Sequence, residues 1–347
     1  MDLFTTRQLL LAIKEKGIRR DSFFKRMWFK ETYTFNTQKV DLDHVPNKTK
    51  IAAYCSPMIG AVVDRAQGFA TSSFMPAYVK SKHAVNSNMT VKRLAGETYA
   101  EPKSPSERQA ALVMQNMEME LTAISDRVEL MCSEMVLTGK TIIDGENIEK
   151  PYEIDSLRDA ENTIVLSGAA RWGNLDQAIH DPTDDFEEWA KASDGIIDIA
   201  VMDTKAWALF KSFKAVKDAL DSRRGSNSEL ETMCKDLGAA VSYKGVIGDV
   251  YVVVVSEEYT DRDGVVKKVM PDNTVILGHT QARGVALYGA IQDLNAQNEG
   301  IDEAELFVRD WIEGNDPAVR YTKAESAPAM YMVDTNRFVV IQVDQEV

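Results

Sequence analysis

The sequence predicts an α+β protein of about two domains, and three features support this. A long helix is predicted over residues 104–138, helices and strands alternate from residue 196 onward, and residues 51–93 hold short β-branched and aromatic runs separated by glycine and proline. The 347 residues suffice for two domains at roughly 150 residues each. With 44% hydrophobic and 27% charged residues, the composition is that of a globular chain, which excludes wholesale disorder.

Residues 104–138 carry the clearest helix signals. Ser104 and Glu107 form a capping-box pattern around Pro105, and Gly139 is expected to end the helix. Apolar residues then recur at alternating spacings of three and four: Met114, Met117, Leu121, Ile124, Val128, Met131 and Met135. Because this stripe is narrow, methionine-rich and poorly flanked by charge pairs, it favours one helix lying on a sheet or hairpin, with a self-associating coiled coil as the alternative.

Two shorter helices are predicted near the N-terminus. The first spans residues 5–17, with a threonine N-cap and a glycine stop. The second, over residues 21–30, is crowded with large apolar side chains, among them Phe23, Phe24, Trp28 and Phe29. So many aromatic residues need a covering surface, which is either a partner molecule or the protein's own core.

Residues 51–93 are predicted to form a long β-hairpin. Between Thr71 and Arg93 the apolar residues show no sustained core-facing pattern, and all the charged residues are basic. We therefore expect this hairpin to project from the body of the protein.

The second half of the sequence predicts an alternating series of helices and strands. These are a strand at 196–202, a helix from Asp203 to Leu220, a helix capped by Asn227 or Ser228 and running to Leu237, and strands at 241–243, 250–255 and 274–277. The chain is expected to end in a hairpin of residues 330–333 and 338–343, turning at 334–336.

The search for catalytic and metal-binding motifs gives only structural readings. Residues 138–141 imitate the end of a phosphate-binding loop, but Glu134 stands where the partner glycine is required, so a helix stop explains them better. Residues 261–264 resemble the start of a calcium loop, but Asp272 occupies the position of the bidentate glutamate, and a hairpin turn fits better. The acidic residues 181–185 fit a helix N-terminus better than a divalent-ion site.

The cysteines and histidines predict no metal, cofactor or disulfide. Cys55, Cys132 and Cys234 are widely and irregularly spaced, so buried free thiols are expected, and the four histidines are scattered. The N-terminal residues lack the order of a secretory signal, which predicts a cytoplasmic protein. Nothing in the sequence gives a positive reason to expect an enzyme.

The formal charge of −14 is divided unevenly along the chain. Residues 1–93 hold 16 Lys and Arg against 7 Asp and Glu, a charge of +9, and residues 94–347 hold 24 against 47, a charge of −23. In a homo-oligomer this lets the basic part of one subunit lie on the acidic part of the next; a basic arm for nucleic acid is the alternative. The first reading is favoured, because an acidic body repels phosphate and no dense basic run is present.

Contiguous strings along nearly the whole chain resemble the major capsid proteins of lambda-like tailed phages. The strings that carry the resemblance lie at residues 54–57, 78–80, 82–83, 114–117, 181–185, 212–217, 223–231, 235–238, 241–245, 271–274, 280–284 and 292–297.

This resemblance implies a Hong Kong 97-type capsid fold. The implied parts are an N-terminal arm (1–50), an extended loop (60–94), a spine helix (104–138), a peripheral domain (51–59, 141–195 and 291–347) and an axial domain (196–290). The implied function is that of a structural protein, not an enzyme, which self-assembles as pentamers and hexamers into an icosahedral head around double-stranded DNA. The resemblance places the protein in the virion capsid, assembled in the host cytoplasm.

The implied partners are further copies of the chain, a scaffolding protein, a portal and trimers of a decoration protein. No membrane contact and no sequence-specific DNA binding is implied. No scaffolding extension precedes the arm, so cleavage of the amino end is not expected, and no Lys-to-Asn crosslink between subunits is expected. An encapsulin-like nanocompartment shell and a cytosolic α/β enzyme remain as alternative function classes.

The candidate functional residues are therefore those of subunit contacts. From the arm and extended loop we expect interface residues at Phe23, Phe24, Trp28, Phe29, Arg65, Lys80, Lys82, Lys92 and Arg93. In the axial domain we expect a loop with Arg223, Arg224, Ser226 and Asn227.

Overall fold

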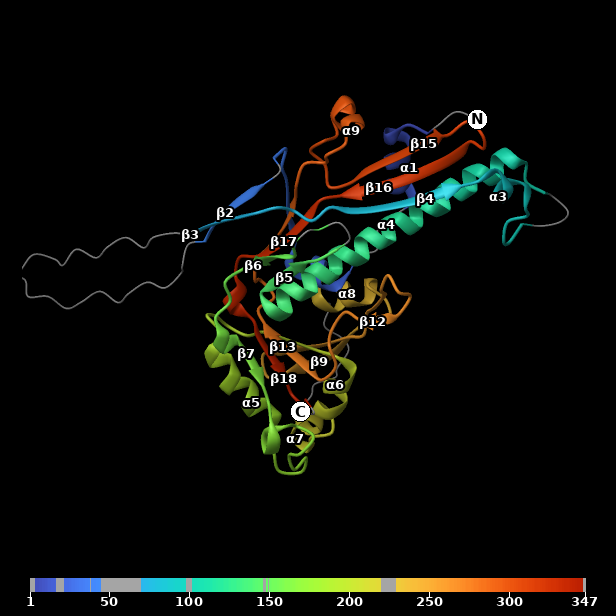
Figure 1. The fold of residues 1–347 in the computed structure, drawn as a ribbon. Helices are drawn as coiled ribbons and strands as arrows, with labels where there is room; N and C mark the ends of the chain where they lie inside the picture. Colours follow the sequence, from blue (N-terminus) through green and yellow to red (C-terminus); the bar gives the residue numbers. More distant parts are fainter. Residues whose placement is uncertain are drawn as a thin grey trace, which may run out of the picture.

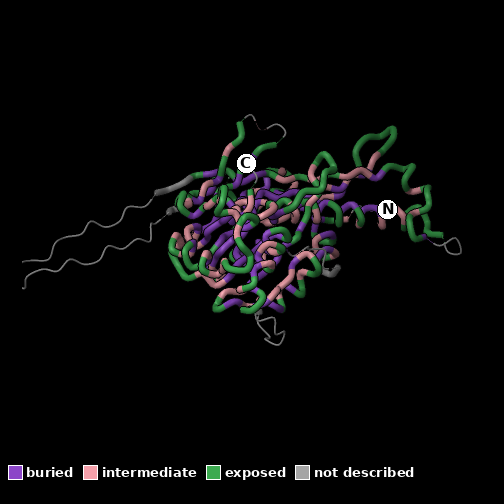
Figure 2. Tube along the Cα trace, turned by 90° about the horizontal axis from the view of Figure 1, so that it is seen from below, coloured by how far each residue is buried: buried purple, intermediate pink, exposed green. Residues whose placement is uncertain are grey.

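The computed structural model describes residues 4–16, 22–37, 39–44, 70–97, 102–145, 148, 150–219 and 229–345. A long helix, α4 (Pro105–Thr138), runs diagonally through the molecule, with a narrow three-stranded sheet along it and a compact sheet-and-helix body beyond its C-terminal half (Figure 1). Buried segments run through this body, and exposed ones lie mostly in its peripheral loops (Figure 2). The mixed architecture confirms the predicted α+β class.

Helix α4 begins and ends as the sequence predicts. The Ser104 side chain accepts from the Glu107 backbone N–H, the Glu107 side chain accepts from Ser104, and Gly139 adopts the left-handed conformation after the last turn. At 1.5 Å per residue, its 34 residues reach about 50 Å. Six residues of the predicted stripe are buried within this one chain, namely Met117, Leu121, Ile124, Val128, Met131 and Met135. The helix therefore lies on the protein's own sheets, which confirms the favoured prediction of a single helix on a sheet over that of a self-associating coiled coil.

A three-stranded antiparallel sheet of β15 (Phe307–Glu313), β16 (Val319–Ser326) and β4 (Val79–Val85) lies along α4, in that order. Within the described part of the chain this corrects the hairpin predicted over residues 51–93, because β4 pairs with β16. The short helix α3 (Ser87–Val91) then packs on α4. Strand β3 (Ala70–Phe74) pairs instead with β2 (Val40–His44). Residues 51–69 of the predicted hairpin lie outside the described residues.

The compact body beyond the C-terminal half of α4, which we call the second body, contains a six-stranded sheet. Its order is β7 (Thr163–Val165), β18 (Val339–Gln342), β13 (Thr274–Gly278), β8 (Ile199–Met202), β10 (Val250–Val255) and β9 (Val241–Ile247). Strands β8 and β13 are buried along their whole length, because neighbours cover them on both sides and both faces. The domain limits predicted above do not follow this sheet, since β7 and β18 join it from outside residues 196–290.

Four helices belong to this body: α5 (Pro182–Trp189), α6 (Thr204–Phe210), α7 (Lys214–Ala219) and α8 (Glu229–Asp236). One continuous helix was predicted from Asp203 to Leu220, but the chain turns at residues 211–213. This turn lets both Phe210 and Phe213 pack on the buried ring of Trp172, with centroids 5.5 and 6.0 Å away. Burial of two aromatic rings outweighs the continuation of a surface helix.

A third sheet joins the N-terminal segment to the body. Strand β1 (Glu31–Thr34) runs parallel to β14 (Gly284–Tyr288), which pairs on its other side with β17 (Pro328–Met332). The predicted C-terminal hairpin is therefore wrong: β17 pairs with β14, whereas β18 pairs with β13 and β7. The short 3-10 helix η4 (Thr335–Arg337) carries the chain from one sheet to the other.

The remaining elements are short. They are helices α1 (Thr6–Lys16), α2 (Phe23–Trp28) and α9 (Leu294–Glu299), 3-10 helices η1 (Ala160–Asn162), η2 (Gly168–Ala170) and η3 (Ala190–Ala192), and the hairpins β5 (Lys140–Ile143) with β6 (Tyr152–Asp155) and β11 (Glu258–Thr260) with β12 (Val266–Lys268). No helix among the described residues is long and apolar enough to cross a membrane.

Candidate assembly surfaces

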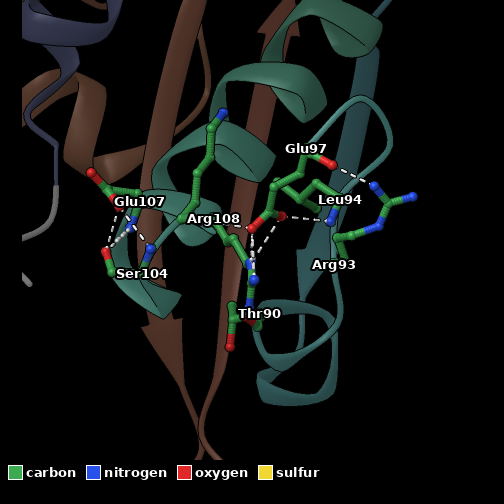
Figure 3. A network of polar contacts seen from close by, with 8 residues as sticks. Thr90, Arg93, Leu94, Glu97, Ser104, Glu107 and Arg108 are labelled. Carbon is green, nitrogen blue, oxygen red and sulfur yellow. Dashed lines mark hydrogen bonds and ion pairs between the residues drawn. The ribbon is translucent and has the colours of Figure 1, made fainter. Parts of the chain in front are cut away.

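A polar cluster fixes the loop in front of α4 (Figure 3). The Glu97 carboxylate accepts hydrogen bonds from Arg108 Nη2 at 2.7 Å, Arg108 Nε at 3.0 Å and the Leu94 backbone N–H at 2.9 Å. The Arg108 hydrogen bonds are the main reason that the pKa of Glu97 falls to about 2. Arg93 donates to the Glu97 carbonyl, so the loop is tied at several points. Its exposed Lys92 and Arg93 are thereby held at this end of the helix.

The four aromatic residues expected at a subunit interface lie inside the protein's own core. Phe23 and Phe24 are fully buried, and Trp28 and Phe29 are each 2% exposed. Trp28 Nε1 donates to the His279 carbonyl at 3.0 Å. The interface expectation for these side chains is therefore corrected, because α4 and the neighbouring sheets already cover the apolar surface that seemed to need a partner. The alternative reading, a helix of the core, is the right one.

The sheet β15–β16–β4 has one face against α4 and one face away from it. Thr322 Oγ1 donates to Glu120 on α4 at 2.8 Å, which places Thr322 on the α4 side. Because alternate residues of a strand point to opposite faces, Tyr321 and Lys323 belong to the other face. The register puts Lys82 beside Lys323. We call this second face the outer face; it carries Lys80 and Lys82 of β4, Tyr321, Lys323 and Glu325 of β16, and Phe307, Arg309 and Trp311 of β15.

The part of the outer face around Lys82, which also holds Arg309, Trp311 and Tyr321, combines cations with aromatic rings. The Trp311 and Tyr321 rings stack at 5.6 Å. Lys82 Nζ lies 3.9 Å from the centroid of Tyr321 and 5.0 Å from that of Trp311, and Arg309 lies over the Trp311 ring. Lys82 Nζ also lies 3.9 Å from Oε2 of the exposed Glu313, and the Lys82 side chain remains 46% exposed. Nearly half of this side chain is therefore accessible to another molecule.

Lys80 forms an ion pair within its own chain. Its Nζ lies 2.7 Å from Oε1 of Glu325, a carboxylate with no exposed surface, which also accepts from Lys323 at 2.7 Å. Lys323 in turn bonds Asp293, ahead of α9, at 2.7 Å. The part of the outer face around Lys80, Lys323 and Glu325 is thus an ion-pair network within one chain.

The structure brings some predicted interface residues together and leaves others undescribed. Lys80 and Lys82 stand on one strand, with Lys92 and Arg93 in the loop after α3. Arg65 and the predicted axial loop with Arg223, Arg224, Ser226 and Asn227 lie outside the described residues. Sequence reasoning missed Arg309, Trp311 and Tyr321. The β-branched and aromatic residues within 307–312 and 319–322 were the signal that could have indicated two strands here.

An acidic surface lies on the second body, around α5. Asp181 caps this helix by accepting from the Thr183 backbone N–H at 2.9 Å, as the sequence predicts. Asp184, Glu187 and Glu188 are exposed. A surface of this charge is complementary to the cations of the outer face.

The cysteine and acidic side chains of the described residues make structural contacts. In the described part of the chain, no group of three or more His, Cys, Asp or Glu side chains could hold a metal ion. Cys132 and Cys234 are buried free thiols, as expected, and burial raises the pKa of each; Cys55 lies outside the described residues. Asp261 turns the β11–β12 hairpin and pairs with Lys267, which confirms the turn expected at residues 261–264.

Comparison with known proteins gives a consistent result over the full length. Residues 5–343 match the family model of phage major capsid protein E. The chain is 46% identical over 343 residues to the major capsid proteins of Escherichia phage lambda and of Enterobacteria phage phi80, covering 99% of this chain and 100% of each relative. A crystal structure of a prophage capsid protein from Escherichia coli CFT073 superposes with a TM-score of 0.83 at 33% identity, covering 99% of this chain and 100% of that one.

The fold and its surfaces therefore define a structural protein of the capsid class, with the Hong Kong 97-type fold. The chain belongs to the phage major capsid protein E family, and within it resembles the lambda-like members. Proteins of this family form the capsid of the virion, so self-association is part of its role. This confirms the family and the function that the sequence strings implied.

Proposed function

We propose that this protein assembles as pentamers and hexamers into an icosahedral phage head that encloses double-stranded DNA. The full-length match to lambda-like major capsid proteins is the observation that carries this proposal. The role is structural and not catalytic, and assembly takes place in the host cytoplasm. The formal charge of −23 over residues 94–347 supports a wall that does not grip its DNA, because like charges repel the phosphate backbone.

The proposed partners follow from the same family membership. A scaffolding protein directs assembly, a portal occupies one vertex, and trimers of a decoration protein stabilise the shell. We expect no covalent bond between subunits. A denaturing gel of mature particles should therefore show a single-chain band, and a ladder of covalent oligomers would contradict this.

The proposed domain boundaries follow the observed sheets. Residues 1–50 are assigned as the arm and 104–138 as the spine helix. Strands β7 and β18 are assigned with residues 196–283 to the axial domain, since they share its sheet. Of the extended loop at 60–94, β4 and α3 are reassigned to the sheet along the spine, because they pair with β16 and pack on α4.

The proposed contact between neighbouring subunits uses the outer face and the loop before α4. Half-exposed Lys82 and exposed Lys92 supply positive charge. Trp311, Tyr321 and Arg309 are of the residue types that contribute most to protein interfaces. The exposed carboxylates around α5 supply a complementary negative surface. We propose that the cations of one subunit lie on acidic surfaces of the next.

Charge reversal tests this contact. Lys82→Glu combined with Lys92→Glu should reduce shell yield and shift the salt dependence of assembly, because attraction between subunits becomes repulsion. Lys80 and Arg93 stay unchanged, since they hold Glu325 and Glu97 of their own chain. The matched control is Lys82→Arg with Lys92→Arg, which keeps both charges and should assemble normally. Shell yield and salt sensitivity left unchanged by the double reversal would contradict the proposed contact.

A further inference from the structure

A cavity of about 360 Å³ lies between the N-terminal helices α1 and α2, the spine helix α4 and strands β1 and β14. Much of its wall is apolar and comes from distant parts of the chain, namely Ile13, Phe29, Leu121, Ile124, Val128 and Leu306. All of these side chains except that of Leu306 are buried. A cavity of this size, with apolar walls and a few polar groups, is of the kind that holds a small ligand or a side chain of another molecule.

Two hydrogen-bond donors meet at this cavity, Lys25 of α2 and Tyr288 of β14. Lys25 Nζ donates to Tyr288 Oη at 3.2 Å. An ammonium group has three N–H donors, and a phenol hydroxyl has one O–H donor. Among the described residues, this is the one hydrogen bond that either head group makes, so two N–H donors of Lys25 and the O–H of Tyr288 remain without an acceptor. Tyr288 is only 3% exposed, and a buried donor normally has a partner.

The charge around the cavity favours an anionic acceptor. Among the residues that line it, Lys25, Arg26 and Lys30 are basic, and Glu305 is acidic. Burial is the main reason that the pKa of Tyr288 is raised, so its hydroxyl keeps the proton and can donate it in a hydrogen bond. An ammonium group and a neutral hydroxyl that lie side by side can each donate to one oxygen of a carboxylate.

We propose that this cavity is a binding site for a carboxylate carried on a short apolar stem, with Lys25 and Tyr288 as the donors to the carboxylate and the apolar wall as the surface that covers the stem. Inorganic phosphate fits less well, because it has no apolar part to cover Ile124 and Val128. Such a carboxylate is carried by a free short-chain acid or by an acidic side chain of a second copy of this chain. The site goes beyond the proposed function, since it does not require a closed shell.

Titration of the unassembled full-length protein with hexanoate tests the site. The methyl NMR signals of Ile13 and Ile124 should shift together and reach saturation, because both side chains line the cavity. Hexanol has the same stem without the charge, and it should bind at least about tenfold more weakly. Hexanoate that causes no saturable shift of these signals, or that binds no better than hexanol, would overturn the proposal.

Two substitutions remove one donor each and keep much of the side-chain volume. Lys25→Met and Tyr288→Phe should each weaken hexanoate binding about tenfold, because each removes a hydrogen bond to a charged group. The matched controls are Lys191→Met and Tyr33→Phe, at exposed positions that do not line the cavity, and both should bind hexanoate as the wild type does. Wild-type affinity in both Lys25→Met and Tyr288→Phe would refute the assigned donors.

Protein concentration distinguishes the two sources of the carboxylate. If an acidic side chain of a second copy enters the cavity, the Ile13 and Ile124 signals should shift as the protein concentration rises without hexanoate, and added hexanoate should reverse this self-association. If the site takes a free acid, these signals should not depend on protein concentration, while hexanoate still binds to saturation.

Discussion

Arg158, in the segment after β6, closes the C-terminal end of the spine helix. Its guanidinium donates hydrogen bonds to the carbonyl oxygens of Met135 and Leu137, both at 3.1 Å, and to Thr335 Oγ1 at 3.2 Å. The last carbonyls of a helix have no partner within the helix, so an outside donor satisfies them. Burial lowers the pKa of Arg158 to about 10, which still leaves it charged at neutral pH. One side chain thus joins α4 to η4, the link between two sheets.

Replacement of this arginine should destabilise the protein strongly. Arg158→Met keeps much of the side-chain volume but removes the guanidinium donors from the Leu137 carbonyl and Thr335, while the Met135 carbonyl keeps its bond from the Gly139 N–H; the expected loss is about 1–3 kcal/mol in the free energy of unfolding. The matched control is Arg283→Met, at an exposed position, which should change it by less than about 0.5 kcal/mol. Urea unfolding of the unassembled protein measures both, and similar losses for the two variants would show that Arg158 has no special role.

Alanine substitutions at two glycines distinguish the cost of a left-handed backbone from the cost of a steric clash. Gly139 and Gly96 both have positive φ angles, +73° and +78°. A Cβ atom at Gly139 would lie 2.8 Å from Cβ of Arg158, whereas nothing lies within 4 Å of one at Gly96. Gly96→Ala should therefore cost about 1–2 kcal/mol from the left-handed conformation alone, and Gly139→Ala clearly more. Thermal unfolding compares them, and an equal loss would contradict the tight packing of Arg158 on this helix end.

The buried pair of Asp310 and Arg320 should show strong coupling. It joins β15 to β16, with Arg320 Nε 2.8 Å from Asp310 Oδ1, and Asp310 Oδ2 also accepts from the Phe4 N–H at 3.1 Å. Arg320→Met alone should cost about 3–5 kcal/mol, because it leaves a buried carboxylate without its cation. After Asp310→Asn the same change should cost at least about 1 kcal/mol less. Additive losses in this double-mutant cycle would mean that the pair contributes no coupling.

The Glu97–Arg108 pair predicts a specific acid sensitivity. Hydrogen bonds from Arg108 lower the pKa of folded Glu97 to about 2, below the ordinary value of about 4.3. Its contribution to stability is therefore present above about pH 4.3 and is lost as the pH falls toward 2. Glu97→Gln should lower the melting temperature at pH 5 and differ less from the wild type as the pH approaches 2. A constant difference across this range would contradict the ion pair.

Local signals in the sequence predicted the spine helix to within a residue at each end. The capping box and Gly139 act within a few residues, so no tertiary information is needed. The pairing of β17 and β18 could not be predicted in this way. A turn joins them, as in a hairpin, but their partners β14 and β13 lie far away in the sequence, and burial in two different sheets decided the outcome.

The candidate surfaces show the same division. Lys82 and Lys92 were predicted from the sequence as interface residues, and both are exposed, as expected of basic side chains in a polar context. The sequence could not decide whether Phe23 and Trp28 face a neighbour or the core, since both settings bury aromatic side chains.

The central claim is that this chain builds a closed shell. Negative-stain electron microscopy of the protein, expressed with and without its scaffolding and decoration partners, tests it most directly. The account predicts closed icosahedral shells with the partners, and aberrant tubes or spirals without the scaffolding protein. A uniform population of small oligomers, even with the partners present, would contradict it.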